Sequence, residues 1–229
     1  MLRGAAVFGV LAFALPATAQ ISGNVTLVSD YRFRGISLSD QKPAAQLSAG
    51  YDHPSGWYAG AFASTVQLLD RSGRELQLLP YAGYAQRVSP GLSWDAGAGY
   101  SSFSGARARN YAEVHGGVSS ENVSTRLYYS PDYFGQGSAT LYAEVNAARR
   151  VVESIQLFGH LGVLRSRNPG IGYERPIQYQ FDIQAGTSVD LDKFNVQLAW
   201  VASDKTYTVY PFSESRNRST VVFRLSRSF

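Results

Sequence analysis

The chain has 229 residues, with 21 lysines and arginines against 17 acidic residues, a formal net charge of +4 and no cysteine. The lack of cysteine excludes disulfides, thiolate metal sites and thiol nucleophiles. Only 17 % of residues are charged, and 22 glycines, 15 tyrosines and 12 phenylalanines occur without a long apolar run, which favours a β-sheet with one lipid-facing side over a water-soluble globule.

The start of the chain has the pattern of a secretory signal. One positive charge precedes an apolar run from Gly4 to Leu15, and an A-x-A site ends at Ala19. The run is too short for a membrane helix. We therefore predict a signal peptide over residues 1–19, cleaved after Ala19, and a single exported domain over residues 20–229.

Period-two alternation of apolar and polar side chains predicts about twelve strands. It is cleanest from Ile21 to Arg34, where Tyr31 and Phe33 should face outward and Arg32 and Arg34 inward. The expected strands cover residues 21–34, 44–52, 57–67, 75–87, 92–102, 110–118, 123–130, 139–147, 154–164, 177–190, 194–203 and 219–229. Strands along the whole chain predict an all-β fold. Their even number is typical of a closed antiparallel transmembrane β-barrel.

Two of these strands have less regular patterns. In the third, we expect Tyr58, Phe62 and Val66 to face outward, because the other face carries mostly small residues. In the fourth, Pro80 should interrupt the ladder because proline has no N–H to donate, and Leu79 should point inward.

The connections between strands alternate in length. Those after even-numbered strands are short turns, and most of the others are longer and richer in charge. The short turns are expected at residues 53–56, 88–91, 119–122, 148–153 and 191–193. Short periplasmic turns and longer extracellular loops are typical of outer-membrane barrels.

Outward-facing aromatic residues gather near the strand ends, as in the aromatic girdles of membrane barrels. The expected periplasmic girdle contains Tyr51, Tyr58, Tyr84, Trp94, Phe194 and Phe229. The expected extracellular girdle contains Tyr31, Phe33, Tyr100, Tyr129 and Tyr179.

The last strand, residues 219–229, alternates apolar and polar side chains and ends on Phe229. It resembles the closing strand of bacterial outer-membrane barrels. That resemblance implies that the barrel assembly machinery recognises this segment and that the strand then pairs with the first one.

Longer strings carry a more specific resemblance. They are S-G-N-V-T-L-V-S-D-Y-R-F-R-G-I-S (Ser22 to Ser37), Y-Y-S-P-D-Y-F-G (Tyr128 to Gly135) and V-V-F-R-L-S-R-S-F at the end of the chain. Together they resemble the TorF-family porins, a proteobacterial family of otherwise unknown function. The resemblance implies an outer-membrane barrel that passes small solutes, and it implies no catalytic residues. The chain departs from the family pattern at Leu79 and Pro80.

Several charged side chains should line the lumen. Counted from the short turns, Glu113, Arg126, Glu144 and His160 lie at similar heights on four successive strands, so that Arg126 could bridge two carboxylates. Tyr128, Asp182 and Arg32 are further lumen residues. Two interpretations stay open: a charged constriction that screens solutes, or a salt-bridge ladder that braces the wall.

Two loop features also have alternative interpretations. The outer loops lean basic, and they either contact lipopolysaccharide phosphates or form a solvated rim. The segment from Tyr128 to Gly135 either folds into the mouth as a plug or forms a loop made rigid by Pro131.

The sequence as a whole favours an outer-membrane porin for passive diffusion of small solutes through a lumen of mixed charge. The alternatives are a non-conducting structural or adhesive barrel and, third, an outer-membrane hydrolase. His53, His115 and His160 do not occupy positions expected for a catalytic rim, so we expect no enzyme activity, no cofactor and no metal site. The expected partners are outer-membrane lipid, lipopolysaccharide and small solutes, with no nucleic acid.

Overall fold

The structure is a computed structural model that describes residues 20–68, 73–167, 177–204 and 218–229. The predicted signal peptide, residues 1–19, lies outside the described residues. None of the helices in the described ranges is long and apolar enough to cross a membrane.

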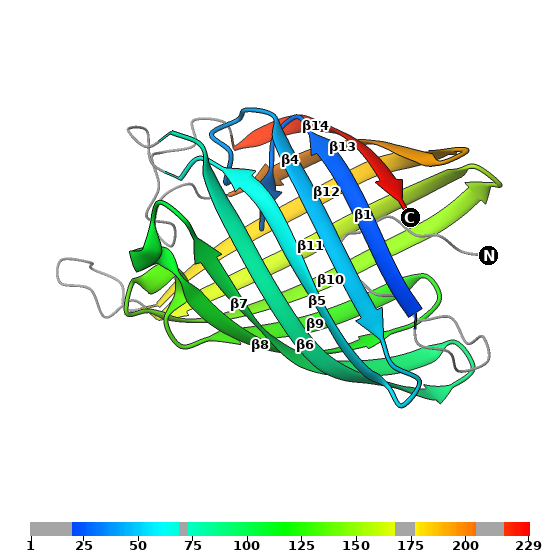
Figure 1. The fold of residues 1–229 in the computed structure, drawn as a ribbon, viewed down its shortest axis with the longest axis horizontal. Helices are drawn as coiled ribbons and strands as arrows, with labels where there is room; N and C mark the ends of the chain where they lie inside the picture. Colours follow the sequence, from blue (N-terminus) through cyan, green and yellow to red (C-terminus); the bar gives the residue numbers. More distant parts are fainter. Residues whose placement is uncertain (1–19, 69–72, 168–176, 205–217) are drawn as a thin grey trace.

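The described residues form a closed antiparallel barrel of twelve strands (Figure 1). The barrel strands are β1 (Gln20–Val28), β4 (Ala44–Asp52), β5 (Trp57–Val66), β6 (Glu75–Ser89), β7 (Leu92–Phe103), β8 (Tyr111–Ser119), β9 (Val123–Ser130), β10 (Ala139–Val152), β11 (Ile155–Arg167), β12 (Ile177–Leu191), β13 (Phe194–Ser203) and β14 (Ser219–Ser228). A separate pair of short strands, β2 (Arg32–Phe33) and β3 (Ile36–Ser37), and two 3-10 helices, η1 (Arg107–Arg109) and η2 (Tyr133–Gly135), complete the described elements.

The barrel closes between its first and last strands, as the sequence predicts. Val25 of β1 lies opposite Arg227 of β14, and Leu27 lies opposite Leu225. Beyond the last strand residue, Gly23 and Phe229 exchange backbone hydrogen bonds of 2.9 and 3.0 Å. β1 begins and β14 ends at the end of the barrel that carries the short turns, which we call the turn end; the opposite end, with the longer connections, is the loop end.

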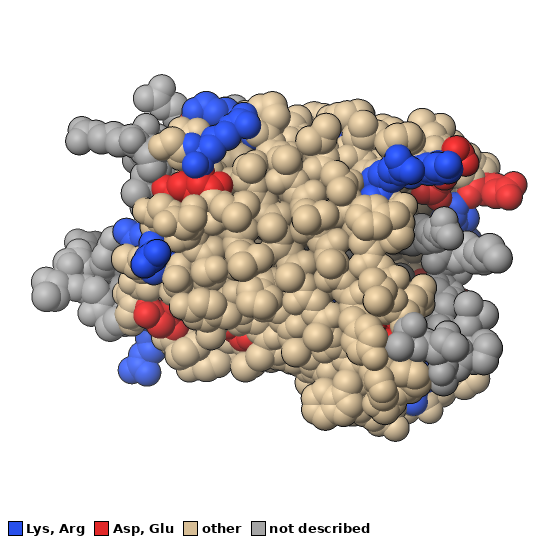
Figure 2. Space-filling model, viewed as in Figure 1, with Lys and Arg blue, Asp and Glu red and all other residues tan. Residues whose placement is uncertain are grey.

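The outer face carries an apolar belt. Figure 2 shows lysines, arginines and acids gathered at the two ends of the barrel, with a band nearly free of charge between them. Large apolar side chains such as Leu161 (58 % exposed) and Phe181 (54 %) are turned out of the fold all around this band. Because that much exposed apolar surface is unfavourable in water, the belt fits a hydrocarbon environment.

Most of the predicted strand limits agree with the structure to within a few residues. The predicted turn at residues 148–153 is wrong, because β10 continues to Val152 and the chain reverses at Glu153 and Ser154. The expectation for the fourth strand is confirmed. On the β7 side the register skips Leu79 and Pro80, although both stay paired with β5, and Leu79 packs against the interior core.

The prediction of one long opening strand is wrong. β1 ends at Val28, and the following residues turn inside the barrel, where Tyr31 is only 5 % exposed and Phe33 packs on the interior core. Tyr31 and Phe33 therefore do not belong to an outer aromatic girdle. The period-two pattern misled because β2 and β3 are also strands, although they belong to an inner hairpin.

The predicted orientation of the third strand is also wrong. Phe62 (9 % exposed) and Val66 (1 %) face inward, and the Tyr58 hydroxyl bonds to a lumen histidine. The small residues of β5 face outward instead. The prediction assumed a polar lumen, whereas the loop-end half of this lumen contains an apolar core. The core residues include Tyr31, Ile36, Leu38, Phe62, Val66, Phe103, Tyr111, Tyr133, Phe134, Tyr142 and Leu164.

Candidate functional site in the barrel lumen

The turn-end half of the lumen is hollow. A cavity of about 600 Å³ reaches from Gln20 and Ser228 at the turn end to Tyr111, Glu113 and Tyr128 farther inside. Its inner lining is mixed in charge and rich in hydroxyl groups. The cavity ends where chain segments from two loop-end connections fold into the barrel.

The first of these segments is residues 29–39, which we call the lumenal hairpin. Arg34 and Gly35 form its two-residue turn, and both have positive φ, 50° and 78°. Two positive φ values in a two-residue turn match a type I′ hairpin, which favours glycine at the second position. The hairpin turns back on itself inside the wall, so it blocks the loop-end half of the lumen.

Asp30 holds the base of the lumenal hairpin together. Its carboxylate pairs with Arg32 Nε at 2.8 Å and accepts a hydrogen bond of 2.5 Å from the Ser37 hydroxyl. Arg32 also donates to the Gly35 carbonyl oxygen at 3.0 Å. Arg32 was predicted as a lumen residue, and it lies within the hairpin and fixes the shape of its turn.

Arg34 anchors the tip of the lumenal hairpin to the opposite wall. Its Nη1 lies 2.9 Å from Glu113 Oε1 on β8. The guanidinium carbon lies 4.1 Å from the ring centre of Tyr142 and 5.1 Å from that of Tyr128. A guanidinium stacked on aromatic rings and paired with a carboxylate is a strong anchor when water is excluded, and the Arg34 side chain is only 4 % exposed.

The tip also touches the wall on its far side. The Gln180 side chain donates to the Arg34 carbonyl oxygen at 3.2 Å. A β-carbon placed on Gly35 would lie 2.8 Å from the β-carbons of Asp182 and Ser203, so the backbone approaches β12 and β13 closely. The hairpin thus contacts strands on both sides of the lumen.

The second inward segment contains η2, between β9 and β10. Tyr133 and Phe134 are fully buried, and the Phe134 ring packs on Phe103 and Tyr111 with centroids 5.6 and 4.6 Å apart. Of the segment from Tyr128 to Gly135, the residues up to Ser130 belong to wall strand β9, and Tyr133 and Phe134 fold into the mouth. This inward part lies beside the lumenal hairpin, because Arg34 stacks on the Tyr133 ring at 5.2 Å.

A first polar cluster surrounds Arg126 on the turn-end side of the plugged region. Arg126 Nη2 pairs with Asp95 Oδ1 at 2.9 Å, and His115 Nε2 lies 3.2 Å from Asp95 Oδ2. The Tyr58 hydroxyl is 3.0 Å from the same histidine nitrogen. The ion pair that the structure gives Arg126 is therefore with Asp95, two strands away, rather than a bridge between Glu113 and Glu144.

A second polar cluster surrounds His160. Its Nε2 lies 2.8 Å from Asp182 Oδ1, and its Nδ1 lies 2.7 Å from Asn146 Oδ1. The Tyr142 hydroxyl donates to Asp182 Oδ2 at 3.1 Å, so the ring that Arg34 stacks on is itself fixed by this cluster. Glu144 lies nearby and accepts a hydrogen bond from Tyr128 at 3.2 Å.

Inward-facing glycines make these long-range bonds geometrically accessible. Gly117 lies between Asp95 and Arg126 in one row of paired residues, and a β-carbon there would come within 2.9 Å of the Arg126 side chain. Gly162 lies between Glu144 and Asp182 in the same way, and a β-carbon there would overlap the Tyr142 hydroxyl. An arginine or tyrosine can therefore lie flat along the wall and reach an acceptor beyond the adjacent strand.

The predicted lumen residues all face inward but divide into separate groups. Glu113 binds the lumenal hairpin, Arg126 belongs to the Asp95 cluster, and Arg32 lies within the hairpin. The remaining four, Tyr128, Glu144, His160 and Asp182, lie in or next to the His160 cluster. Within the described ranges, no three His, Asp or Glu side chains are placed to hold a metal ion.

Sequence reasoning missed Arg34 and Tyr142 as central residues of the lumen. The Arg34-Gly35 pair between two short alternating segments was the available signal, because such a pair can form a two-residue hairpin turn. For Tyr142, the signal was Gly162, an inward-facing glycine on the next strand that leaves room for the tyrosine side chain. Both signals require the strand register, which the sequence pattern fixes only loosely.

Comparison with known proteins gives one family and several barrels of similar fold. Residues 14–229 match the model of a family described as "Bacterial protein of unknown function (Gcw_chp)". No curated protein matches the chain.

Three solved structures illustrate the likeness of fold. A KdgM porin aligns with a TM-score of 0.52 at 12 % identity, over 93 % of this chain and 98 % of that one. A NanC porin gives 0.54 at 11 % identity, over 92 % and 99 %. An outer membrane channel from Pseudomonas putida F1 gives 0.52 at 12 % identity, over 94 % and 97 %. At such low identity the likeness establishes the barrel fold alone.

Proposed function

Because the chain belongs to the Gcw_chp family of bacterial proteins, whose description states no activity, we propose from its geometry that it is an outer-membrane porin for passive diffusion of small solutes. The observation that carries the proposal is a closed barrel with an apolar outer belt and a turn-end cavity of mixed charge. Barrels of this fold in the comparisons are porins and channels. The turn end is then periplasmic and the loop end extracellular.

The narrower assignment to the TorF-family porins is part of the same proposal. It rests on the strings from Ser22 to Ser37 and from Tyr128 to Gly135. These strings contain the lumenal hairpin up to Ser37 and the η2 segment, which both fold into the lumen. Members of a family defined by such strings would share a barrel whose lumen is blocked by its own inward-folded segments.

In this proposal the lumenal hairpin is a gate. The hairpin must move for a solute path to form, since Arg34 and the apolar core fill the loop-end half of the lumen. The same filling favours a second candidate, a non-conducting structural or adhesive barrel. Neither candidate assigns catalytic work to His115 or His160, so we keep the expectation of no enzyme activity as part of the proposal.

Electrical recording separates the two candidates. We expect purified, refolded protein in planar lipid bilayers to give brief, discrete current steps separated by long closures, because the closed arrangement is well anchored. Liposomes containing the protein should swell slowly in small sugars. If neither the protein nor a variant without the lumenal hairpin conducts, the structural barrel is the better assignment.

Arg126 is proposed to brace the wall rather than to screen solutes. The variant Arg126→Ala should lower the free energy of unfolding in detergent by about 2–3 kcal/mol, because it leaves the mostly buried Asp95 carboxylate without its ion pair. The reversal potential in a KCl gradient should not change. The double variant Asp95→Ala/Arg126→Ala should recover part of the lost stability, and a shifted reversal potential in Arg126→Ala would instead identify a charged constriction.

Export and assembly complete the proposal. The signal over residues 1–19 would be cleaved after Ala19, and the barrel assembly machinery would recognise the C-terminal strand through Phe229. The ring of Phe229 lies over Gly23 of β1, where a β-carbon would approach it to 2.4 Å. The last residue therefore has a docking place on the first strand.

A further inference from the structure

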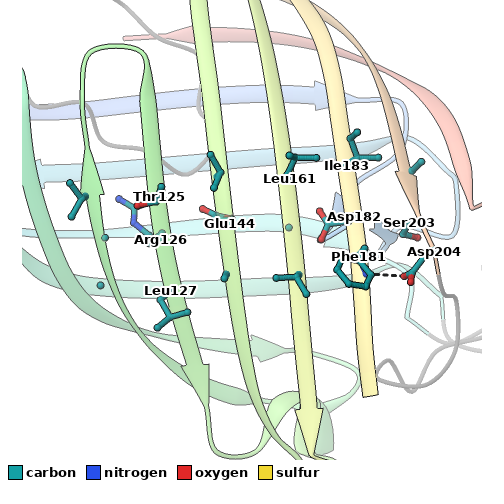
Figure 3. Close-up of a pocket in the computed structure, with 18 residues that line it drawn as sticks. Thr125, Arg126, Leu127, Glu144, Leu161, Phe181, Asp182, Ile183, Ser203 and Asp204 are labelled. Carbon is teal, nitrogen blue, oxygen red and sulfur yellow. Dashed lines mark hydrogen bonds between the residues drawn. The ribbon is translucent and has the colours of Figure 1, made fainter. Parts of the chain in front are cut away.

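The outer wall carries a shallow apolar hollow across β8 to β13. Its volume is about 980 Å³, and Figure 3 shows the labelled lining residues Leu127 on β9, Leu161 on β11, and Phe181 and Ile183 on β12. These side chains belong to the exposed, lipid-facing set and not to the lumen. The hollow is thus separate from the proposed solute path.

Gly116 and Ala143 leave the hollow open between larger side chains. Gly116, Leu127, Ala143, Val163 and Phe181 lie opposite one another in a row of paired residues across five strands. At Gly116 an added β-carbon would meet nothing closer than a backbone oxygen 3.8 Å away, so no neighbour fills the place of the missing side chain. Five strands at their usual spacing make this row about 19 Å long, a length that suits a chain-like apolar group.

A basic group lies beyond the hollow toward the loop end. Arg165 follows Val163 by two residues on β11, so it faces outward about 7 Å farther along the same strand. It is exposed, and its paired neighbours are Leu141 and Tyr179. Arg167 follows on the same face. Among the described residues, neither arginine has an ion pair.

One acid borders the hollow and limits where an anion can lie. Asp204 lines its loop-end corner beside β12, and its Oδ1 accepts a hydrogen bond from the Phe181 backbone N–H at 2.8 Å. The positive charge is on β11 and the negative charge lies across β12. An anionic headgroup would therefore bind on the β11 side.

We propose that this wall binds one molecule of lipopolysaccharide, with an acyl chain in the hollow and a headgroup phosphate on Arg165 and Arg167. Charge complementarity selects this occupant, since arginine forks recognise phosphate and the hollow accepts hydrocarbon. The outer leaflet is the one that meets the loop end, an orientation that rests on the proposed function. A second barrel packed on the same wall would have to bring its own apolar belt against two exposed arginines.

Native mass spectrometry with three variants tests this site. The barrel, extracted in detergent, is mixed with purified rough-type lipopolysaccharide, and in separate arms with phosphatidylglycerol and phosphatidylethanolamine. We expect the unchanged protein to retain one lipopolysaccharide. Arg165→Gln/Arg167→Gln should weaken retention roughly tenfold or more, because it removes two charge-assisted contacts with phosphate. Gly116→Leu/Ala143→Leu, which fills the hollow, should weaken it similarly.

The matched control is Arg107→Gln/Arg109→Gln, which removes the same charge from another part of the loop end and should leave retention within about twofold. Heat-modifiable migration in gels verifies that each variant is a folded barrel. Equal retention of phosphatidylglycerol, an equal loss in the control, no effect of the hollow-filling variant, or a dimer mass in place of bound lipid would each overturn the proposal. The readout is lipid retention, so it is independent of whether the barrel conducts.

Discussion

Replacing the lumenal hairpin by a short flexible linker is expected to raise the mean current per barrel roughly tenfold or more, because a twelve-strand barrel holds a solute path once the side chains that fill it are removed. The variant keeps Ser29, which bonds to Phe223 of β14, and replaces residues 30–39 by the four-residue linker Gly-Ser-Gly-Ser between β1 and β4. It removes Tyr31, Ile36 and Leu38 from the apolar core and Arg34 from its aromatic surroundings. Single-channel recording in planar bilayers measures the effect.

The reverse experiment locks the hairpin to the wall. A β-carbon on Gly35 would lie 2.8 Å from those of Ser203 and Asp182, so the pair Gly35→Cys/Ser203→Cys needs an outward shift of about 1 Å to reach disulfide geometry, with the cysteine at residue 35 held at a positive φ of 78°. The chain has no cysteine of its own, so no other pairing competes. Oxidation should abolish current steps, and a reductant should restore them.

The two single-cysteine variants are the controls for the lock, and both should respond to neither reagent. A locked barrel that conducts like the unchanged protein would show that solutes pass by another route. A linker variant that stays silent, although folded by heat-modifiable migration, would remove the gate from the proposal and favour the structural barrel.

Deleting Phe229 is expected to remove most of the folded protein from the outer membrane. The deletion eliminates both backbone hydrogen bonds between Gly23 and Phe229 and the ring that covers Gly23. Since β1 and β14 pair only from Asn24 and Ser228 onward in the strand register, this contact extends a short closing seam. Heat-modifiable migration of outer-membrane fractions measures the folded amount.

Phe194→Ala is the matched control for the deletion. Phe194 is an exposed aromatic residue at the same turn end, and it pairs with Arg227 from the β13 side of β14, whereas Gly23 lies on β1 at the other side of β14. It should leave the folded amount nearly unchanged. Refolding into detergent without cellular factors then distinguishes the two possible causes of a loss of folded protein. Loss in cells alone indicates recognition by the assembly machinery, loss in both indicates failed docking, and loss in neither contradicts the role of Phe229.

The strand pattern was predictable because a membrane barrel repeats one simple physical contrast. Each wall residue faces either lipid or lumen, so apolar and polar side chains alternate with period two. The limits of β4, β9 and β13 follow from this alternation without correction. The rule failed where its premise failed. In β5 the lumen is apolar, so Phe62 and Val66 face inward, and after Val28 the alternation belongs to a hairpin that leaves the wall.

The candidate site was predictable in its members but not in its contacts. Alternation placed Arg126, Glu144 and His160 in the lumen, because side-chain direction follows from strand position. The partner of Arg126 depends on what lies between strands, and Gly117 lets its guanidinium cross to Asp95. The central role of Arg34 depends on where the hairpin folds. Contacts of this kind depend on register and on long side chains, which the period-two pattern does not encode.

The burial of the Arg34–Glu113 pair has a consequence for how the closed barrel responds to electrolyte. With side-chain exposures of 4 % and 15 %, the two charges are mostly buried, and Glu113 borders the turn-end cavity. Concentrated salt shortens the Debye length to about 3 Å at 1 M and weakens ion pairs on a surface, but it screens a mostly buried pair much less. The closed arrangement of the barrel should therefore be about as stable at high salt concentration as at low salt concentration.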